Sequence, residues 1–300
     1  MTTKPIVRQQ LDPAERMIVP FENVSRYARI LISGPSGAGK TSIIGTACKK
    51  ALYKGVLTTD ISNLLVIELD PDGDITFKDM GVRPDVVKPT TETELIEILQ
   101  YLNSDKSSRY DTVAIDPYNE LQWILSRTSL AAGIAEAAKG KSPRQHDTEI
   151  PELREYLRLY VKARNINNML LSIKKHLIVT CIMEIKDDPK DMDKAQDKRH
   201  KIISLALEGK MAHMLSAAFS IHGILEKEGN GDNIHNTLDF NRFNSEAKTR
   251  FKMNHFVESN KMENPTFPKL LFSMGIKAPS FNKIQWAKNI QGLFIEGIKD

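Results

Sequence analysis

The chain has 300 residues, of which 41% are hydrophobic and 27% charged, and this globular composition argues against a disordered or low-complexity chain. Such a length accommodates one α/β domain with extensions, or two domains of about 150 residues. The formal net charge of +4 permits nucleic-acid contact without arguing for it, and two cysteines are too few for a disulfide framework.

The first 24 residues are polar and contain three prolines, so they are expected to form an N-terminal extension. They contain no apolar stretch of the kind found in secretory signals. The longest apolar-leaning stretch, residues 169–185, is interrupted by Lys174, Lys175 and His176, which excludes a membrane span. We therefore expect a cytoplasmic protein.

Apolar runs then alternate with helical patterns along the chain. The predicted strands are 27–33, 64–67, 112–115, 176–181, 219–225 and 237–243. The predicted helices are 41–52, 90–102, a short helix in the small-residue connection 126–149, and a helix that starts at Pro151. The alternating charges of 186–201 indicate a solvated loop. This order predicts an α/β fold with a mostly parallel sheet covered by helices on both faces.

The helix that starts at Pro151 has the clearest amphipathic pattern of the chain. Its apolar residues repeat at three and four positions, as Leu153, Tyr156, Leu157, Tyr160 and Val161.

The strongest functional signal follows the first predicted strand. It is the phosphate-binding loop pattern G-x-x-x-x-G-K-[ST], formed by Gly34, Pro35, Ser36, Gly37, Ala38, Gly39, Lys40 and Thr41. Glycines allow backbone N–H groups to curl around phosphate oxygens, and the start of the following helix adds partial positive charge. We expect Lys40 to reach the β- and γ-phosphates of ATP and the Thr41 hydroxyl to bind Mg²⁺.

A Mg²⁺ site of this kind also needs a carboxylate at the end of a hydrophobic strand. Asp116, directly after the 112–115 strand, is the best candidate.

Hydrolysis further requires a base or water-positioning group near the γ-phosphate. Glu68 and Asp70 follow the 64–67 strand two positions apart, so they should point to the same face. Pro117 occupies the place where AAA+ proteins carry a glutamate after the metal aspartate. We found neither the N-K-x-D motif of GTPases after a strand nor the arginine-rich lid of nucleoside kinases.

With these motifs the sequence resembles the RecA/RadA-like phage ATPases, AAA-family phage nucleotide-binding proteins that include single-strand annealing proteins. The resemblance covers roughly residues 28–253. Apart from the phosphate-binding loop it depends on the order of several weaker motifs, namely 67–70, 110–116, 119–121, 177–180, 208–212 and 247–251.

The resemblance implies a RecA-like core over residues 25–260 and a C-terminal extension over 261–300. It also implies that Asp70 takes the place of the catalytic glutamate and Asp116 that of the metal aspartate. Lys248 and Arg250 match a K-x-R-F element that, in RadA-like rings, reaches the nucleotide of the adjacent subunit. A homo-oligomer with nucleotide at its subunit interfaces follows from this similarity.

Three departures from the family pattern bear on the rate of hydrolysis. Aspartate at position 70 is shorter than glutamate, and Lys252 replaces a glycine. Cys181 and Ile182 stand where relatives carry a polar sensor, which leaves Thr180 and Glu184 as substitutes. These departures predict slow hydrolysis, although nucleotide binding should be retained.

Basic and aromatic residues alternate between positions 242 and 288, which is one way to hold single-stranded DNA. The basic residues are Arg242, Lys248, Arg250, Lys252, Lys261, Lys269, Lys277, Lys283 and Lys288, and the aromatic residues are Phe243, Phe251, Phe256, Phe267, Phe272, Phe281 and Trp286. The same aromatic residues could instead pack this segment onto the core.

The sequence thus predicts an ATP- and Mg²⁺-binding ATPase that acts on single-stranded DNA in phage recombination or replication, in the cytoplasm of a bacterial host. Two alternatives remain open: a nucleotide-dependent switch without DNA binding, and a small-molecule kinase.

Overall fold

The computed structural model describes most of the chain between residues 27 and 276. The described residues are 27–48, 52–53, 56–57, 64–140, 150–188, 190, 201–229, 234–242, 245–250, 253 and 257–276. The expected N-terminal extension, most of the 186–201 loop and five of the predicted aromatic contacts lie outside them. These five contacts are Phe243, Phe251, Phe256, Phe281 and Trp286.

Ten strands of the described residues form one sheet in the order β12-β10-β9-β1-β7-β6-β4-β5, with β11 paired to β9 and β8 to β7. Neighbours from β9 to β5 run parallel, whereas β8, β10, β11 and β12 are attached antiparallel. The strands are β1 Arg29–Gly34, β4 Leu64–Glu68, β5 Asp85–Val87, β6 Thr112–Asp116, β7 His176–Asp187, β8 Lys201–Leu205, β9 Ile221–Glu228, β10 His235–Asp239, β11 Lys248–Thr249 and β12 Lys261–Glu263. A separate pair consists of β2 Leu52–Tyr53 and β3 Val56–Leu57.

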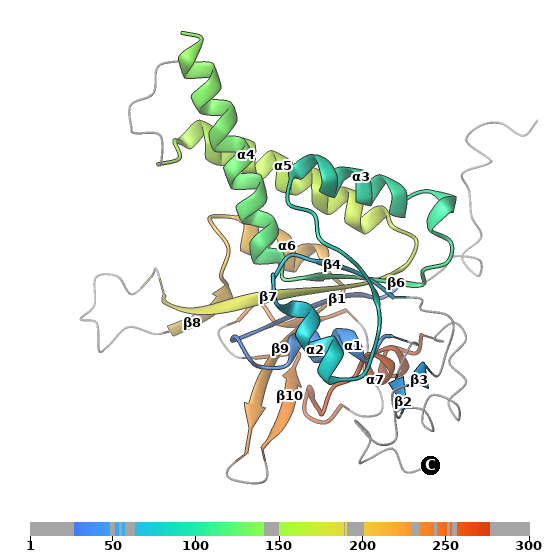
Figure 1. Cartoon of the computed structure of the whole chain (residues 1–300). Coiled ribbons are helices and arrows are strands. Elements are labelled where there is room, and N and C mark those ends of the chain that lie inside the picture. Colours follow the sequence, from blue (N-terminus) through green and yellow to red (C-terminus); the bar gives the residue numbers. More distant parts are fainter. Residues whose placement is uncertain are drawn as a thin grey trace, which may run out of the picture.

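Helices cover both faces of the sheet (Figure 1). They are α1 Lys40–Gly45, α2 Gly73–Asp79, α3 Glu92–Leu102, α4 Tyr118–Ala138, α5 Leu153–Ser172, α6 Met211–Ala218 and α7 Phe267–Ser273, with a short 3₁₀ turn, η3, at Asp105–Ser107. Side chains of α1, α2 and α7 fill one core, and those of α3, α4, α5 and α6 fill the other. The predicted α/β fold, with a mostly parallel sheet covered by helices on both faces, is confirmed.

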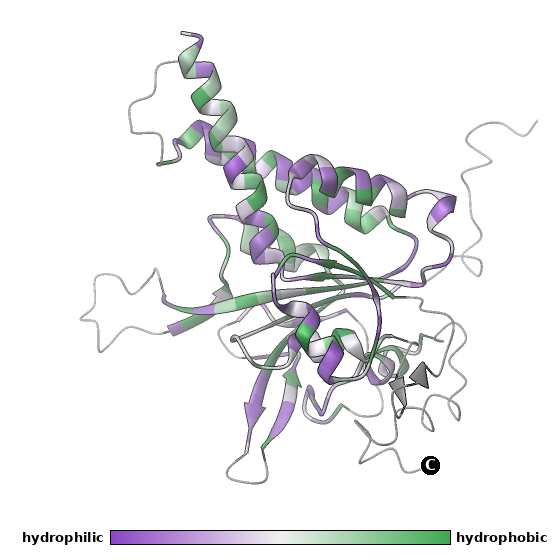
Figure 2. Cartoon of the chain, viewed as in Figure 1, coloured by the Kyte–Doolittle hydropathy of each residue, from purple (hydrophilic) through white to green (hydrophobic). Residues whose placement is uncertain are grey.

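The central strands are apolar along their length because both of their faces are covered. In β1, for example, Ile30 and Ile32 point into the core between the sheet and α1, whereas Leu31 points into the core on the opposite face of the sheet. Figure 2 shows hydrophobic residues concentrated on these strands. No helix of the described residues is both long and apolar enough to cross a membrane.

Strand register brings three polar side chains into one row on the face of α1. Glu68 pairs with Asp116 across β4 and β6, and Thr180 pairs with Ile32 of β1. Side chains in register on parallel strands point to the same face. The row lies at the carboxyl ends of β4 and β6, beside the loop that follows β1.

Two helical predictions differ from the structure at their ends. The helix expected over 41–52 is confirmed only as α1, which ends at Gly45. Its end is explained by Thr46, whose hydroxyl donates to the Ile43 carbonyl and accepts from the Phe267 N–H, at 2.6 and 2.8 Å. Helix α3 begins at Glu92, two residues later than predicted, behind a capping box in which Thr91 and Glu94 bond to each other's backbone N–H groups.

The expectation for residues 126–149 is wrong in its first part. Instead of a short helix in a mobile connection, these residues continue α4 to Ala138, and residues 141–149 lie outside the described part. Alanine has the highest helix propensity, so the small residues of this stretch extend a helix that is anchored by buried Leu121 and Leu125.

The helix predicted after Pro151 is confirmed as α5, but its conspicuous apolar repeat lies on the surface. Leu153, Leu157 and Val161 are 76, 59 and 56% exposed. A second repeat, formed by Leu159, Ala163, Ile166 and Leu170, packs into the core instead.

Residues 261–276 lie beyond the expected boundary at residue 260. They contribute β12 to the sheet, and α7 packs against the core of α1. Phe267 of α7 is buried and Phe272 is 55% exposed.

Candidate functional site

The loop between β1 and α1 has the backbone conformation that its glycines allow. Gly37 and Gly39 have φ angles of 73° and 94°, in the left-handed region that favours glycine. At Gly34 the restriction is space, because an added Cβ would lie 2.4 Å from the carbonyl oxygen of Leu225 in β9. Pro35, Ser36 and Gly37 of this loop are exposed, and Ala38 is buried.

Lys40 and Thr41 are the first two residues of α1, which begins at the carboxyl edge of the sheet. The ammonium of Lys40 donates to the carbonyl oxygens of Gly34 and Pro35, at 3.0 and 2.8 Å, so it lies across the loop. Burial lowers the pKa of Lys40, and the nearby charge of Asp116 raises it in part. A cation held inside a loop of this shape can neutralise phosphate oxygens.

Asp116 lies directly against this loop, as predicted. Its Oδ2 accepts a hydrogen bond of 2.6 Å from the Thr41 hydroxyl, and its Oδ1 accepts one from the Thr180 hydroxyl. Burial raises the pKa of Asp116, whereas the bonds from Thr180 and Thr41 and the charge of Lys40 lower it. The structure therefore joins the three residues predicted to bind phosphate and metal, Lys40, Thr41 and Asp116, into one cluster.

The two acidic candidates at the end of β4 differ in environment. Glu68 is 1% exposed, and its Oε2 lies 3.4 Å from the ammonium of Lys88. Burial raises the pKa of Glu68, and Lys88 lowers it in part. Asp70 is exposed and accepts a hydrogen bond of 3.1 Å from the backbone N–H of Asp72. Asp70 is therefore open to a water molecule, whereas Glu68 is enclosed.

The two residues expected to substitute for the polar sensor, Thr180 and Glu184, lie in different surroundings in the structure. Thr180 is buried against Asp116, whereas Glu184 forms an ion pair with Lys186 and lines a separate pocket with residues of α4 and α5.

The structure does not bring Lys248 and Arg250 to the phosphate-binding loop of the same chain. Lys248 pairs with His222 of β9, and the backbone N–H of Arg250 bonds to the carbonyl of Ser220. Both positions lie toward the amino ends of β9 and β1, whereas the loop follows the carboxyl end of β1. The Arg250 guanidinium donates to the carbonyl of Ala217 at 2.9 Å and is exposed.

Sequence reasoning missed three residues near the site. Lys88 pairs with Glu68 and follows β5, which was not predicted. Asn236 of β10 comes so close to Gly39 that an added Cβ there would lie 3.1 Å from its Nδ2. Buried His222 bonds through Nε2 to Ser33, the residue before the loop, at 2.8 Å. No sequence motif marks these contacts, because each depends on strands distant in the chain.

Comparison with known proteins places this geometry in a wider group. A family model described as an AAA domain matches residues 26–251. No curated protein matches the chain significantly. Similar solved structures include a KaiC-like protein from the hyperthermophilic archaeon Pyrococcus horikoshii OT3, with 11% identity, a TM-score of 0.41 and coverage of 81% of this chain and 93% of that one. Another is the RadB recombinase, with 13% identity, a TM-score of 0.37 and coverage of 74% and 86%.

Proposed function

The chain belongs to the AAA domain family, and from this premise we propose that it is a Mg²⁺-dependent ATPase that acts on single-stranded DNA in phage recombination or replication. The observation that carries the nucleotide part is the cluster of Lys40, Thr41 and Asp116 at the loop after β1. The DNA and phage parts rest on the family resemblance of the sequence.

The donors of this cluster suit a magnesium ion. Mg²⁺ prefers oxygen ligands, and the Thr41 hydroxyl and the Asp116 carboxylate present two oxygens 2.6 Å apart. When bound, the ion would neutralise charge on the phosphates of the nucleotide. Thr41 and Asp116 would hold it, and Lys40 would bind the phosphates beside it.

The acidic residues at the end of β4 are the candidates for activating the water molecule that attacks the nucleotide. Attack on the γ-phosphate needs a carboxylate that orients a water molecule and accepts its proton as a general base. Asp70 is accessible and close enough to Asp116 for its charge to raise the pKa of that carboxyl. We assign the water-positioning role to Asp70, and to Glu68 the role of holding Lys88 and the turn before α2.

Thr180 is a positioning residue in this proposal, because its hydroxyl stabilises the ionised form of Asp116. Thr180→Val keeps the shape of the side chain and removes that hydrogen bond, so the pKa of Asp116 should rise further. We expect the acid limb of the kcat/KM profile for ATP hydrolysis to move to higher pH.

Thr180→Ser serves as the control for this variant, since it restores the hydroxyl and should restore the profile. A Thr180→Val enzyme that is slower at every pH, with an unmoved acid limb, would show that Thr180 acts only through packing.

Lys248 and Arg250 are proposed to act on the nucleotide of a neighbouring subunit. Their distance from the loop of their own chain is compatible with this, and cations beside a transferring phosphoryl group stabilise the charge that develops there. The proposal therefore requires a homo-oligomer with nucleotide at its interfaces.

Arg250→Ala should lower turnover more than ATP affinity, as expected for a group that acts in the transition state. Mixing this variant with Lys40→Ala should restore part of the activity, because a mixed interface can combine an intact loop with an intact arginine. Full activity of Arg250→Ala alone would remove the residue from the mechanism, and a mixture as inactive as its parts would refute action between subunits.

The experiment that tests the whole proposal is ADP production by the wild-type protein, titrated with single-stranded DNA. The proposal predicts ADP release that requires Mg²⁺ and an oligonucleotide affinity that changes with ATP. Phosphate transfer that requires an added acceptor would instead identify a kinase. ATP binding with negligible turnover and an oligonucleotide affinity indifferent to ATP would identify a switch.

A further inference from the structure

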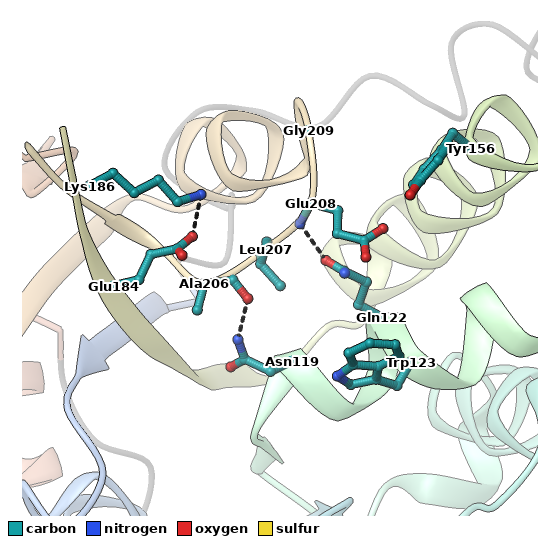
Figure 3. A pocket seen from close by; sticks show the side chains of 10 residues that line it. All are labelled: Asn119, Gln122, Trp123, Tyr156, Glu184, Lys186, Ala206, Leu207, Glu208 and Gly209. Carbon is teal, nitrogen blue, oxygen red and sulfur yellow. Dashed lines mark hydrogen bonds and ion pairs between the residues drawn. The ribbon is translucent and has the colours of Figure 1, made fainter. Parts of the chain in front are cut away.

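A second pocket, of about 500 Å³, opens between α4, α5, the end of β7 and the segment before α6 (Figure 3). It lies at the carboxyl edge of the same sheet but on the opposite face from α1. Its size falls in the range of ligand sites. None of its residues belongs to the nucleotide cluster.

Two aromatic rings line this pocket. Trp123 of α4 is 54% exposed and Tyr156 of α5 is 42% exposed, and Figure 3 shows the Gln122 and Glu208 side chains between them. Large rings left open to water at a pocket are suited to stacking on a flat ligand, and every nucleobase offers such a face.

The polar groups of the pocket favour a ligand with N–H donors. Oε2 of Glu208 is buried and has no hydrogen-bond partner among the described residues. Gln122 Oε1 accepts the Glu208 N–H at 2.9 Å, which fixes the backbone of Glu208 at the pocket. Lys186 is paired with Glu184, so within the described part of the chain no cation that lines the pocket is paired with Glu208. Such a pocket repels a phosphate and suits the polar edge of a base.

The pocket is connected to the nucleotide site by hydrogen bonds. Asn119 lines the pocket and lies three residues after Asp116 in the chain. Its side-chain oxygen accepts a hydrogen bond of 2.7 Å from the backbone N–H of Ile182. Ile182 lies two residues after Thr180, the partner of Asp116. The Asn119 amide also donates to the carbonyl of Ala206, at 2.7 Å, on the far wall of the pocket. The Asn119 side chain therefore bonds both to the pocket wall and to the strand that carries Thr180.

We propose that this pocket binds a base of single-stranded DNA, stacked on Trp123 and Tyr156 with its N–H groups directed to Glu208. The inference rests on the proposed function and gives the DNA a place in the structure. The phosphates of the strand stay outside the pocket.

Tryptophan fluorescence provides a direct test. The chain has two tryptophans, so Trp286→Phe leaves Trp123 as the reporter. Titration with a mixed-sequence oligonucleotide should quench it in a saturable way, because bases stacked on an indole quench its emission. An abasic oligonucleotide of equal length carries the same charge and should not quench.

Affinity measurements by fluorescence anisotropy of a labelled oligonucleotide complete the test. Trp123→Ala and Tyr156→Leu should each weaken binding about tenfold, because each removes a ring on which the base stacks. Leu157→Ala is the matched control, because Leu157 is 59% exposed on α5 and does not line the pocket. ATP binding should persist in all three variants.

Oligonucleotide binding that neither quenches Trp123 nor weakens in these variants would overturn the pocket assignment and leave the proposed function standing. Absence of oligonucleotide binding in a wild-type protein that still binds ATP would overturn both the pocket and the DNA part of the function. Loss of ATP binding is a separate failure, which concerns only the Lys40 cluster.

Discussion

Lys40→Ala should lower ATP affinity by at least about 100-fold, which corresponds to ~3 kcal/mol. The Lys40 ammonium is held inside the loop by the carbonyls of Gly34 and Pro35, so it meets phosphate without first being ordered. Alanine removes this charge and leaves phosphate oxygens in a half-buried loop without a cation. Titration calorimetry with ATP and Mg²⁺ measures the loss directly.

Lys78→Ala is the control for this substitution, because it removes the same charge from an exposed position on α2 and should leave ATP affinity unchanged. Thermal unfolding of Lys40→Ala, followed by circular dichroism, checks that the loop variant is folded. Micromolar ATP affinity in a folded Lys40→Ala protein would refute the phosphate site.

The phosphate-binding loop could be predicted from sequence because its chemistry is local. The positive φ angles of Gly37 and Gly39 and the order of Lys40 and Thr41 are all encoded within one short segment. Asp116 was found as well, because the acid at the end of a buried parallel strand must lie at the same sheet edge as the loop.

Contacts between distant strands could not be found in this way. Thr180 meets Asp116 only because β7 lies between β1 and β6, an order that alternating strands and helices do not specify. The same holds for Lys88 beside Glu68, since β5 is a short and partly exposed strand without an apolar run.

Helix α5 shows a different kind of error, because it has two apolar repeats and the more conspicuous one lies outside. Its buried repeat contains the small Ala163, which allows close packing but weakens the pattern in the sequence. The exposed Tyr156 belongs to the other repeat, and this position is what allows it to line the second pocket. A periodic pattern identifies a helix, whereas its tertiary neighbours decide which side is buried.

Asp70→Asn should lower the turnover of ATP by about 100-fold or more and leave ATP affinity intact, since a general base contributes ~10²–10⁴-fold. The amide oxygen of asparagine can still accept the Asp72 N–H that Asp70 Oδ1 accepts at 3.1 Å, so the turn is preserved. What is lost is the negative charge that accepts a proton from water. Single-turnover and steady-state ADP release, with ATP binding measured separately, distinguish the two effects.

Glu68→Gln and Asp72→Asn decide whether the effect belongs to Asp70. Asp72 is exposed two residues away, so neutralising it should change nothing in turnover. Glu68 is enclosed beside Lys88, and Glu68→Gln should mainly lower the thermal stability, because it removes the buried charge that pairs with Lys88 and leaves that lysine only its longer ion pair with Asp74, at 3.7 Å. If Glu68→Gln abolished turnover in a folded protein while Asp70→Asn remained active, the base would be Glu68. The enclosed carboxylate, with the pKa that burial raises, would then have to become accessible during the reaction.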